Sequence, residues 1–154
     1  MVSVNKYIID TSAMLAQKPD EQYRRNVYRS LWNRIDVMVQ EQEIVTCSEI
    51  AAEVQDDDVK NWMTEQGMKV LPIDDEVQEY VREIVTEVNK DFVDFKTDKS
   101  SGDVFLIATA KKYGLSIITE EAVNSPKKIP FTCSKMGIRC MNLLGFMEEN
   151  GMAL

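Results

Sequence analysis

Five short apolar runs, separated by longer segments with helical periodicity, limit the possible folds of this chain. The runs are Tyr7–Ile9, Glu43–Thr46, Lys69–Leu71, Leu115–Ile118 and Arg139–Met141, the last expected at an edge. Short, continuously apolar strands that alternate with helices are typical of parallel sheets covered on both faces. The pattern therefore predicts an α/β fold: a three-layer α/β/α sandwich around a central, mostly parallel sheet of roughly four to five short strands.

The segments between these runs repeat apolar residues every three to four positions, which predicts helices. The expected helices are Asp20–Gln42, Cys47–Gln55, Asp58–Gln66, Asp75–Phe95, Asp103–Tyr113 and Asn142–Glu149. Polar Asp94–Gly102 and proline-containing Ser125–Thr132 are expected to be loops. Because the chain has no repeat, no low-complexity tract and no Gly/Ser linker, we expect one domain over residues 1–154.

The composition excludes several kinds of chemistry. The sequence has no histidine, which rules out Ser-His-Asp catalysis, Cys-His catalysis and His-ligated zinc. Cys47, Cys133 and Cys140 form no C-x-x-C motif and are expected to be small buried thiols. The net charge of −8 argues against a non-specific nucleic-acid clamp. Carboxylates remain as the polar catalysts, and they imply metal ions or proton transfer.

The N-terminus and the hydropathy pattern bear on location. No stretch approaches the ~20 apolar residues of a membrane span, and the first residues lack the basic and then apolar pattern of a signal peptide. We therefore expect a cytoplasmic protein that does not associate with membranes.

Acidic residues stand at the ends of the predicted strands and at the start of one helix. They are Asp10, Glu49, Glu53, Asp103, Glu120 and Glu121. In parallel α/β sheets the ligand crevice lies beyond the carboxyl ends of the strands, so these side chains should converge there. Converging carboxylates repel and raise one another's pKa values unless a cation joins them. Hard oxygen ligands suit Mg²⁺ or Mn²⁺.

Most of these acids also have a purely structural explanation. Asp10 is an ordinary residue type for a helix N-cap. Glu49 could complete a capping box that begins at Thr46, and Asp103 one that begins at Ser100. An acid in the first turn of a helix, as expected for Glu120 and Glu121, complements the helix dipole.

Two of the acids point more strongly to a site. Glu53 has no capping role and lies beside the apolar stripe of its helix, where an unpaired charge is costly; we therefore prefer Glu53 over Glu49. Asp103 precedes Leu106 and Ala110 at helical spacing, so in a helix its side chain lies on the same inward-facing stripe as these two apolar residues.

Four segments, in order, resemble the motifs of the PIN-domain ribonuclease family. They are Lys6–Ala13, Ser48–Val54, Asp103–Ala110 and Ile117–Glu121. The downstream segment Lys128–Cys133 is similar to stand-alone PIN-like proteins of the VapC-type toxin branch. The resemblance spans nearly the whole chain, and it implies the same three-layer fold.

The resemblance also implies functional residues. Asp10, Glu53, Asp103 and Glu121 correspond to the catalytic, metal-binding acids of the family. The fourth acid is more often Asp in the family, so the choice between Glu121 and Glu120 stays open. Besides Glu120, the expected accessory residues are Thr11, Ser12 and Glu49. The hydroxyls of Thr11 and Ser12 could bond a ligand carboxylate or the scissile phosphate, or they could cap the first helix.

The activity that the resemblance implies is endonucleolytic hydrolysis of RNA phosphodiester bonds with Mg²⁺ or Mn²⁺. The implied partners are single-stranded or structured RNA, an antitoxin protein and a second copy of the chain. Residues that bind RNA are not predicted.

Two other readings remain open. One is a degenerate PIN-fold protein that binds RNA or a protein partner without cutting. The other is an aspartyl phosphotransfer domain, although the phosphatase pattern requires a second Asp where Ser12 stands.

Overall fold

The central sheet of the protein is parallel and five-stranded. A computed structural model describes residues 5–88, 101–121 and 129–152. The strands are β1 (Tyr7–Ile9), β2 (Ile44–Cys47), β3 (Val70–Leu71), β4 (Ser116–Ile118) and β5 (Cys140–Met141). They pair in the order β3-β2-β1-β4-β5, and every pairing is parallel. The predicted α/β fold with a parallel sheet is confirmed, and the last strand lies at an edge as expected.

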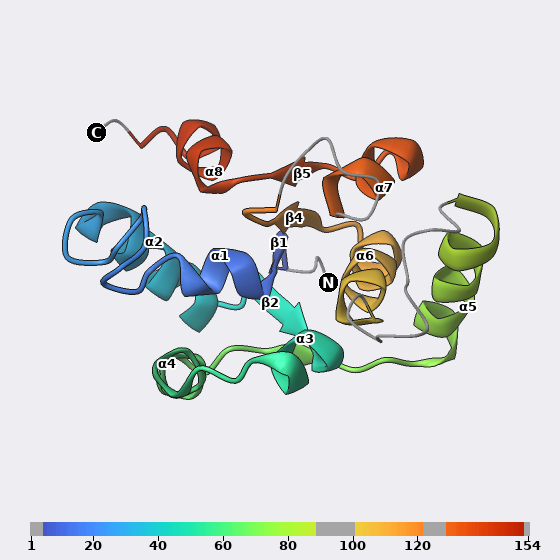
Figure 1. The fold of residues 1–154 in the computed structure, drawn as a ribbon, viewed down its shortest axis with the longest axis horizontal. Helices are drawn as coiled ribbons and strands as arrows, with labels where there is room; N and C mark the ends of the chain where they lie inside the picture. Colours follow the sequence, from blue (N-terminus) through green and yellow to red (C-terminus); the bar gives the residue numbers. More distant parts are fainter. Residues whose placement is uncertain (1–4, 89–100, 122–128, 153–154) are drawn as a thin grey trace.

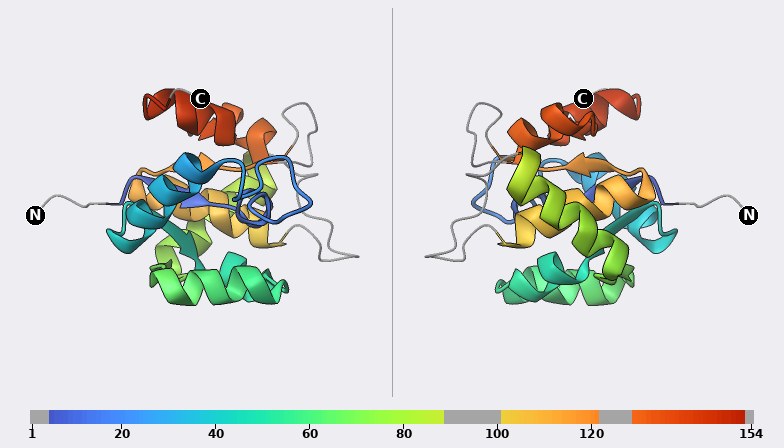
Figure 2. Two further views of the ribbon diagram at one scale, coloured as in Figure 1. Left: turned by 90° about the vertical axis from the view of Figure 1, so that its left-hand side faces the viewer. Right: turned by 90° about the vertical axis from the view of Figure 1, so that its right-hand side faces the viewer.

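Helices cover both faces of the sheet. They are α1 (Thr11–Leu15), α2 (Arg29–Gln40), α3 (Ser48–Glu53), α4 (Asp57–Gln66), α5 (Asp75–Glu83), the π-helical η1 (Ile84–Val88), α6 (Ser101–Tyr113), α7 (Ile129–Met136) and α8 (Leu143–Glu149). In Figure 1, α1 and α2 lie on one side of the strands, and α5, α6 and α7 on the other. Figure 2 shows α4 and α8 at opposite ends of the stack of strands.

The three middle strands are largely buried because most of their residues are apolar. Every residue of β1 and β2 is buried, and so are Ile117 and Ile118 of β4. Since β1 lies between β2 and β4, the residues that follow these three strands are neighbours at the carboxyl ends of the strands. The acids were expected at this end of the sheet.

The expected helix over Asp20–Gln42 is wrong in its first part, because α2 begins only at Arg29. Residues 20–28 form successive turns, and Val27 is 62% exposed instead of joining the buried stripe. Side chains of α2 hold these turns: the Trp32 indole donates to the Tyr23 carbonyl at 2.6 Å, and Asp36 pairs with the Arg25 guanidinium. These contacts outweigh the local periodicity.

The expected loops also need correction where they are described. Ile129–Thr132 forms the first turn of α7, and Ser101 and Gly102 already belong to α6. Proline is tolerated in a first helical turn because the N–H it lacks would have no helical partner. The rest of both loops, and the end of the helix expected over Asp75–Phe95 beyond Val88, lie outside the described residues.

The cysteines are free thiols. Cys47 and Cys133 are buried as expected, whereas Cys140 is half-buried. Burial raises the pKa of the Cys47 thiol to about 11, so it stays protonated. Within the described ranges, the helices lack the combined length and apolar character that crossing a bilayer requires.

Candidate metal centre

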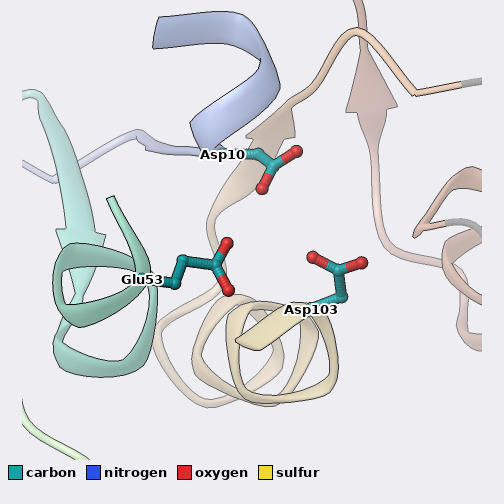
Figure 3. A group of neighbouring side chains, drawn as sticks. All are labelled: Asp10, Glu53 and Asp103. Carbon is teal, nitrogen blue, oxygen red and sulfur yellow. The ribbon is translucent and has the colours of Figure 1, made fainter. Parts of the chain in front are cut away.

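Three of the predicted acids meet in one place. Asp10 stands between β1 and α1, Glu53 is the last residue of α3, and Asp103 lies in the first turn of α6. Each offers a carboxylate oxygen, and these oxygens lie within 4.8 Å of one another. Figure 3 shows the three carboxylates facing a common space from three separate elements.

The chain path explains this convergence. Asp10 follows the carboxyl end of β1, and α3 starts from the carboxyl end of the neighbouring β2. Helix α6 leads into β4, so it returns the chain to the amino ends of the strands and must start near their carboxyl ends. Asp103, in its first turn, therefore reaches the same edge.

Asp10 occupies the N-cap position of α1, but its side chain is held by hydroxyl groups and not by the helix N–H groups. Its side chain is 2% exposed and makes no capping bond to α1. Its Oδ2 accepts hydrogen bonds from Ser12 Oγ at 2.7 Å and from Thr119 Oγ1 at 2.9 Å. The N-cap explanation for this side chain is therefore wrong, and two hydroxyls orient the carboxylate.

Thr119 is a site residue that sequence reasoning did not single out. It directly follows β4, and Ile118 pairs with Ile9 across the sheet, so Thr119 stands beside Asp10. Its hydroxyl also accepts the Glu121 N–H at 3.2 Å, while the Ser12 hydroxyl accepts the Glu120 N–H at 3.0 Å. The available signal was a hydroxyl residue at the carboxyl end of a central strand.

Glu53 is exposed overall, but its carboxyl group faces the other acids. Thr11 Oγ1 donates to its Oε1 at 3.0 Å. Burial of the carboxyl group raises its pKa, the Thr11 hydrogen bond opposes this, and the charges of Asp10 and Glu121 raise it further. The two adjacent hydroxyl groups therefore bind different acids: Thr11 donates to Glu53, and Ser12 donates to Asp10.

The pKa of Asp103 is strongly raised. Burial, followed by the negative charges of Asp10, Glu121 and Glu53, raises its pKa from 3.8 to about 8. Its charged form therefore needs a counter-ion, as expected for converging carboxylates. A cation bound among the three acids would meet that need.

Glu121 lies beside the three acids without joining them. A hydrogen bond with its side chain contributes to the raised pKa of Asp103. Its Oε2 also accepts the Ile129 N–H at 2.9 Å, which satisfies a free amide at the start of α7. The structure thus places Glu121 next to the cluster, between Asp103 and a helix end.

Glu120 and Glu49 lie outside the group of three acids. Glu120 Oε2 accepts the Leu143 N–H at the start of α8, at 2.8 Å. Glu49 is exposed in the first turn of α3, outside the group of three. The capping box expected from Thr46 is not formed, because the N-cap is Cys47 and the Thr46 hydroxyl donates to the Ile9 carbonyl.

The donor set fits a hard divalent cation. All three groups are carboxylates, and Mg²⁺ and Mn²⁺ prefer such oxygen ligands. Their mutual repulsion is uncompensated within the described residues, where neither Lys nor Arg forms an ion pair with Asp10, Glu53 or Asp103. The three residues could therefore hold a metal ion.

Solved structures share this fold at low sequence identity. FitAcB from Neisseria gonorrhoeae is 16% identical, with a TM-score of 0.56 over 90% of this chain and 98% of that chain. VapBC2 from Rickettsia felis, solved bound to a promoter DNA fragment, is 15% identical, with a TM-score of 0.56 over 88% of this chain and 97% of that chain. PAE2754 from Pyrobaculum aerophilum is 14% identical, with a TM-score of 0.56 over 97% of this chain and 92% of that chain. These likenesses confirm the PIN-like fold that the sequence resemblance implied.

The sequence itself gives one further match. Among curated proteins, no match to the chain is found. The family model described as Domain of unknown function (DUF4411) matches residues 7–154. Because this match covers nearly the whole chain, the protein belongs to the DUF4411 family.

Proposed function

We propose that this protein is a metal-dependent endoribonuclease that hydrolyses RNA phosphodiester bonds with Mg²⁺ or Mn²⁺. One observation carries the proposal: Asp10, Glu53 and Asp103 come from three separate elements, yet their oxygens lie within 4.8 Å of one another. They do so at the carboxyl edge of a parallel sheet, where ligands of α/β folds bind.

In this proposal Asp10, Asp103 and Glu53 hold the ion, and Glu121 contributes negative charge beside them. A bound divalent ion supplies Lewis-acid stabilisation of the charge that develops on the phosphate. Ser12 and Thr119 keep Asp10 oriented through its Oδ2, and Thr11 does the same for Glu53 through Oε1. Such supporting hydrogen bonds fix the direction of metal ligands.

Asp103 couples cation binding to proton release. Its raised pKa means that, without a cation, the carboxyl group is largely protonated at neutral pH. A carboxylate must lose its proton to bind a metal, so metal affinity should rise with pH toward about 8.

We further propose that the protein is the toxin of a toxin–antitoxin pair and acts in the cytoplasm. The support is the shared fold with FitAcB and VapBC2, together with the resemblance to the VapC-type branch. The corresponding partners are an antitoxin protein and a second copy of the chain. Co-expression with the product of the neighbouring gene should suppress RNA cleavage if that product is the antitoxin.

The direct test of the activity is RNA cleavage by the purified protein. Mixed single-stranded RNA is incubated with the protein and Mg²⁺, Mn²⁺ or EDTA, and the same assays use Asp10→Asn. The matched control is Asp74→Asn, which alters an aspartate that also precedes a helix but pairs with Lys112. Cleavage should require metal, disappear in Asp10→Asn and persist in Asp74→Asn.

The other outcomes separate the alternatives. Equal cleavage by Asp10→Asn would show that the assigned site is wrong. Binding of Mn²⁺ and RNA without cleavage would favour the degenerate PIN-fold protein. Transfer of phosphate from a small phosphodonor to Asp10 would favour the phosphotransfer domain.

A further inference from the structure

Gly102 packs against the carboxylate of Glu53. It is the second residue of α6, it is buried, and it directly precedes Asp103. A Cβ atom added at Gly102 would lie 2.2 Å from Glu53 Oε2 and 2.9 Å from Glu53 Cδ. Contacts this short do not occur, so any side chain here would have to displace the Glu53 carboxylate.

The backbone conformation does not explain this glycine. The described glycines with positive φ are Gly67, Gly114, Gly137 and Gly151, and Gly102 is not among them. In a helical conformation alanine is more stable than glycine. The observation that accounts for glycine at this position is therefore the space that the Glu53 carboxylate takes.

The Glu53 carboxylate is thus held on two sides. On one side Thr11 Oγ1 donates to Oε1 at 3.0 Å, and on the other the bare Cα of Gly102 leaves room for Oε2. After Glu53 the chain leaves the helix, with Val54 in an extended conformation. We infer that Gly102 is a positioning residue, whose missing side chain lets Glu53 reach the site shared with Asp10 and Asp103.

The inference rests on the proposed function in one respect, namely that the three acids bind a divalent ion. The three atoms nearest to a methyl group at position 102 all belong to the far end of the Glu53 side chain, which is flexible and exposed overall. Glu53 could swing outward at little cost to the fold, while the metal site would lose one of its ligands. Gly102→Ala should therefore impair metal binding without unfolding the protein.

The test is a calorimetric titration of the full chain with Mn²⁺. Gly102→Ala should weaken Mn²⁺ binding by roughly tenfold, the range found when support for a metal ligand is lost. Without metal, its melting temperature should equal or exceed that of the unaltered protein. Gly145→Ala is the matched control, because Gly145 is also helical and its added Cβ would approach Met141 and Asn142, away from the acids.

A double-mutant cycle distinguishes positioning from a general structural effect. The side chain in Glu53→Asp is one methylene shorter and clears the added methyl group. The loss of Mn²⁺ affinity caused by Gly102→Ala should therefore shrink in the Glu53→Asp background. A loss of equal size in both backgrounds would overturn the inference.

The remaining outcomes keep this inference separate from the nuclease proposal. Unchanged Mn²⁺ affinity in Gly102→Ala would overturn the inference while leaving the nuclease proposal intact. Failure of the unaltered protein to cut RNA, with Mn²⁺ binding that Gly102→Ala weakens, would reject the nuclease and support the positioning role. No Mn²⁺ binding by the unaltered protein would overturn the inference, and RNA cleavage, measured separately, would then judge the nuclease.

Discussion

Asp10 and Asp74 occupy the same local position, directly before a helix, but they have different surroundings. Asp74 caps its own helix by accepting the Val77 N–H at 2.9 Å, and it pairs with Lys112. The hydrogen bond from Lys112 lowers the pKa of Asp74 and keeps it charged. Asp10 makes no capping bond, and it accepts two hydroxyl hydrogen bonds beside other acids.

Asp56 repeats the arrangement of Asp74. It accepts the Val59 N–H, pairs with Lys18, and has a lowered pKa because of these partners. In contrast, the pKa values of Glu53 and Asp103 are raised. The same chain therefore supplies lysines to the acids before α4 and α5 and leaves the cluster near Asp10 in excess negative charge. A structural acid is recognised here by its partners and not by its place before a helix.

The largest expected effect concerns Mn²⁺ binding. Asp103→Asn removes a charged ligand, so Mn²⁺ affinity should fall by at least about a hundredfold, the upper range for losing even a supporting residue. Asp74→Asn should bind Mn²⁺ as the unaltered protein does. At a hundred times its Kd, Mn²⁺ should stabilise the unaltered protein by about 2.7 kcal/mol, measured as a rise in Tm that EDTA reverses. Equal losses in both variants would erase the contrast between the two kinds of acid.

A smaller effect is expected at the hydroxyls that hold Asp10. Thr119→Val keeps the shape of the side chain but removes its hydrogen bond to Asp10 Oδ2. Mn²⁺ affinity should fall by roughly tenfold, as measured by calorimetry. Thr64→Val is the control, because the Thr64 hydroxyl donates to the Lys60 carbonyl of its own helix. Undiminished affinity in Thr119→Val would show that Ser12 alone orients the carboxylate.

The pH dependence of stability should also separate the regions. In the absence of metal, folded Asp103 keeps a proton up to about pH 8, whereas the unfolded residue releases it near 3.8. The unfolded state therefore binds fewer protons across this window, and the free energy of unfolding should fall as pH rises through it. Urea unfolding in EDTA at several pH values measures this slope. Asp103→Asn should flatten the slope, and an unchanged slope would contradict the raised pKa.

The smallest effect is expected where the acids are paired. Asp74→Ala removes a helix cap and a half-buried ion pair, so it should lower Tm slightly and leave Mn²⁺ binding unchanged. Asp103→Asn should instead raise the metal-free Tm at neutral pH, because asparagine is neutral without the proton that Asp103 must take up on folding. Shifts of the same sign in both variants would refute the distinction.

Part of the site could be predicted because it depends on strand order along the chain. Asp10 was found from its place directly after a strand, and Asp103 from its inward position on a helix. The choice between Glu120 and Glu121 could not be made in this way. It depends on where each carboxylate finds a partner. Both accept the N–H of a helix start, Glu120 from Leu143 and Glu121 from Ile129, and Glu121 also bonds the side chain of Asp103.

The two wrongly predicted segments have the same cause, namely contacts with residues outside the local sequence pattern. The turns at residues 20–28 depend on Arg25 reaching Asp36 and on Trp32 reaching the Tyr23 carbonyl. The first turn of α7 begins where the Ile129 N–H meets Glu121. In each case a side chain outside the local pattern satisfies a backbone or charged group, which periodicity cannot reveal.

The amino-acid sequence was sufficient to indicate a parallel α/β fold and an acidic site at one edge of its sheet, because burial and strand direction follow from hydrophobic spacing. Three-dimensional packing was needed to bring Thr119 beside Asp10 and Gly102 against Glu53. These contacts join residues from different elements, and they exist because β4 lies next to β1 and α6 approaches α3. Hydrophobic periodicity encodes which face of an element is buried but not which element lies against it.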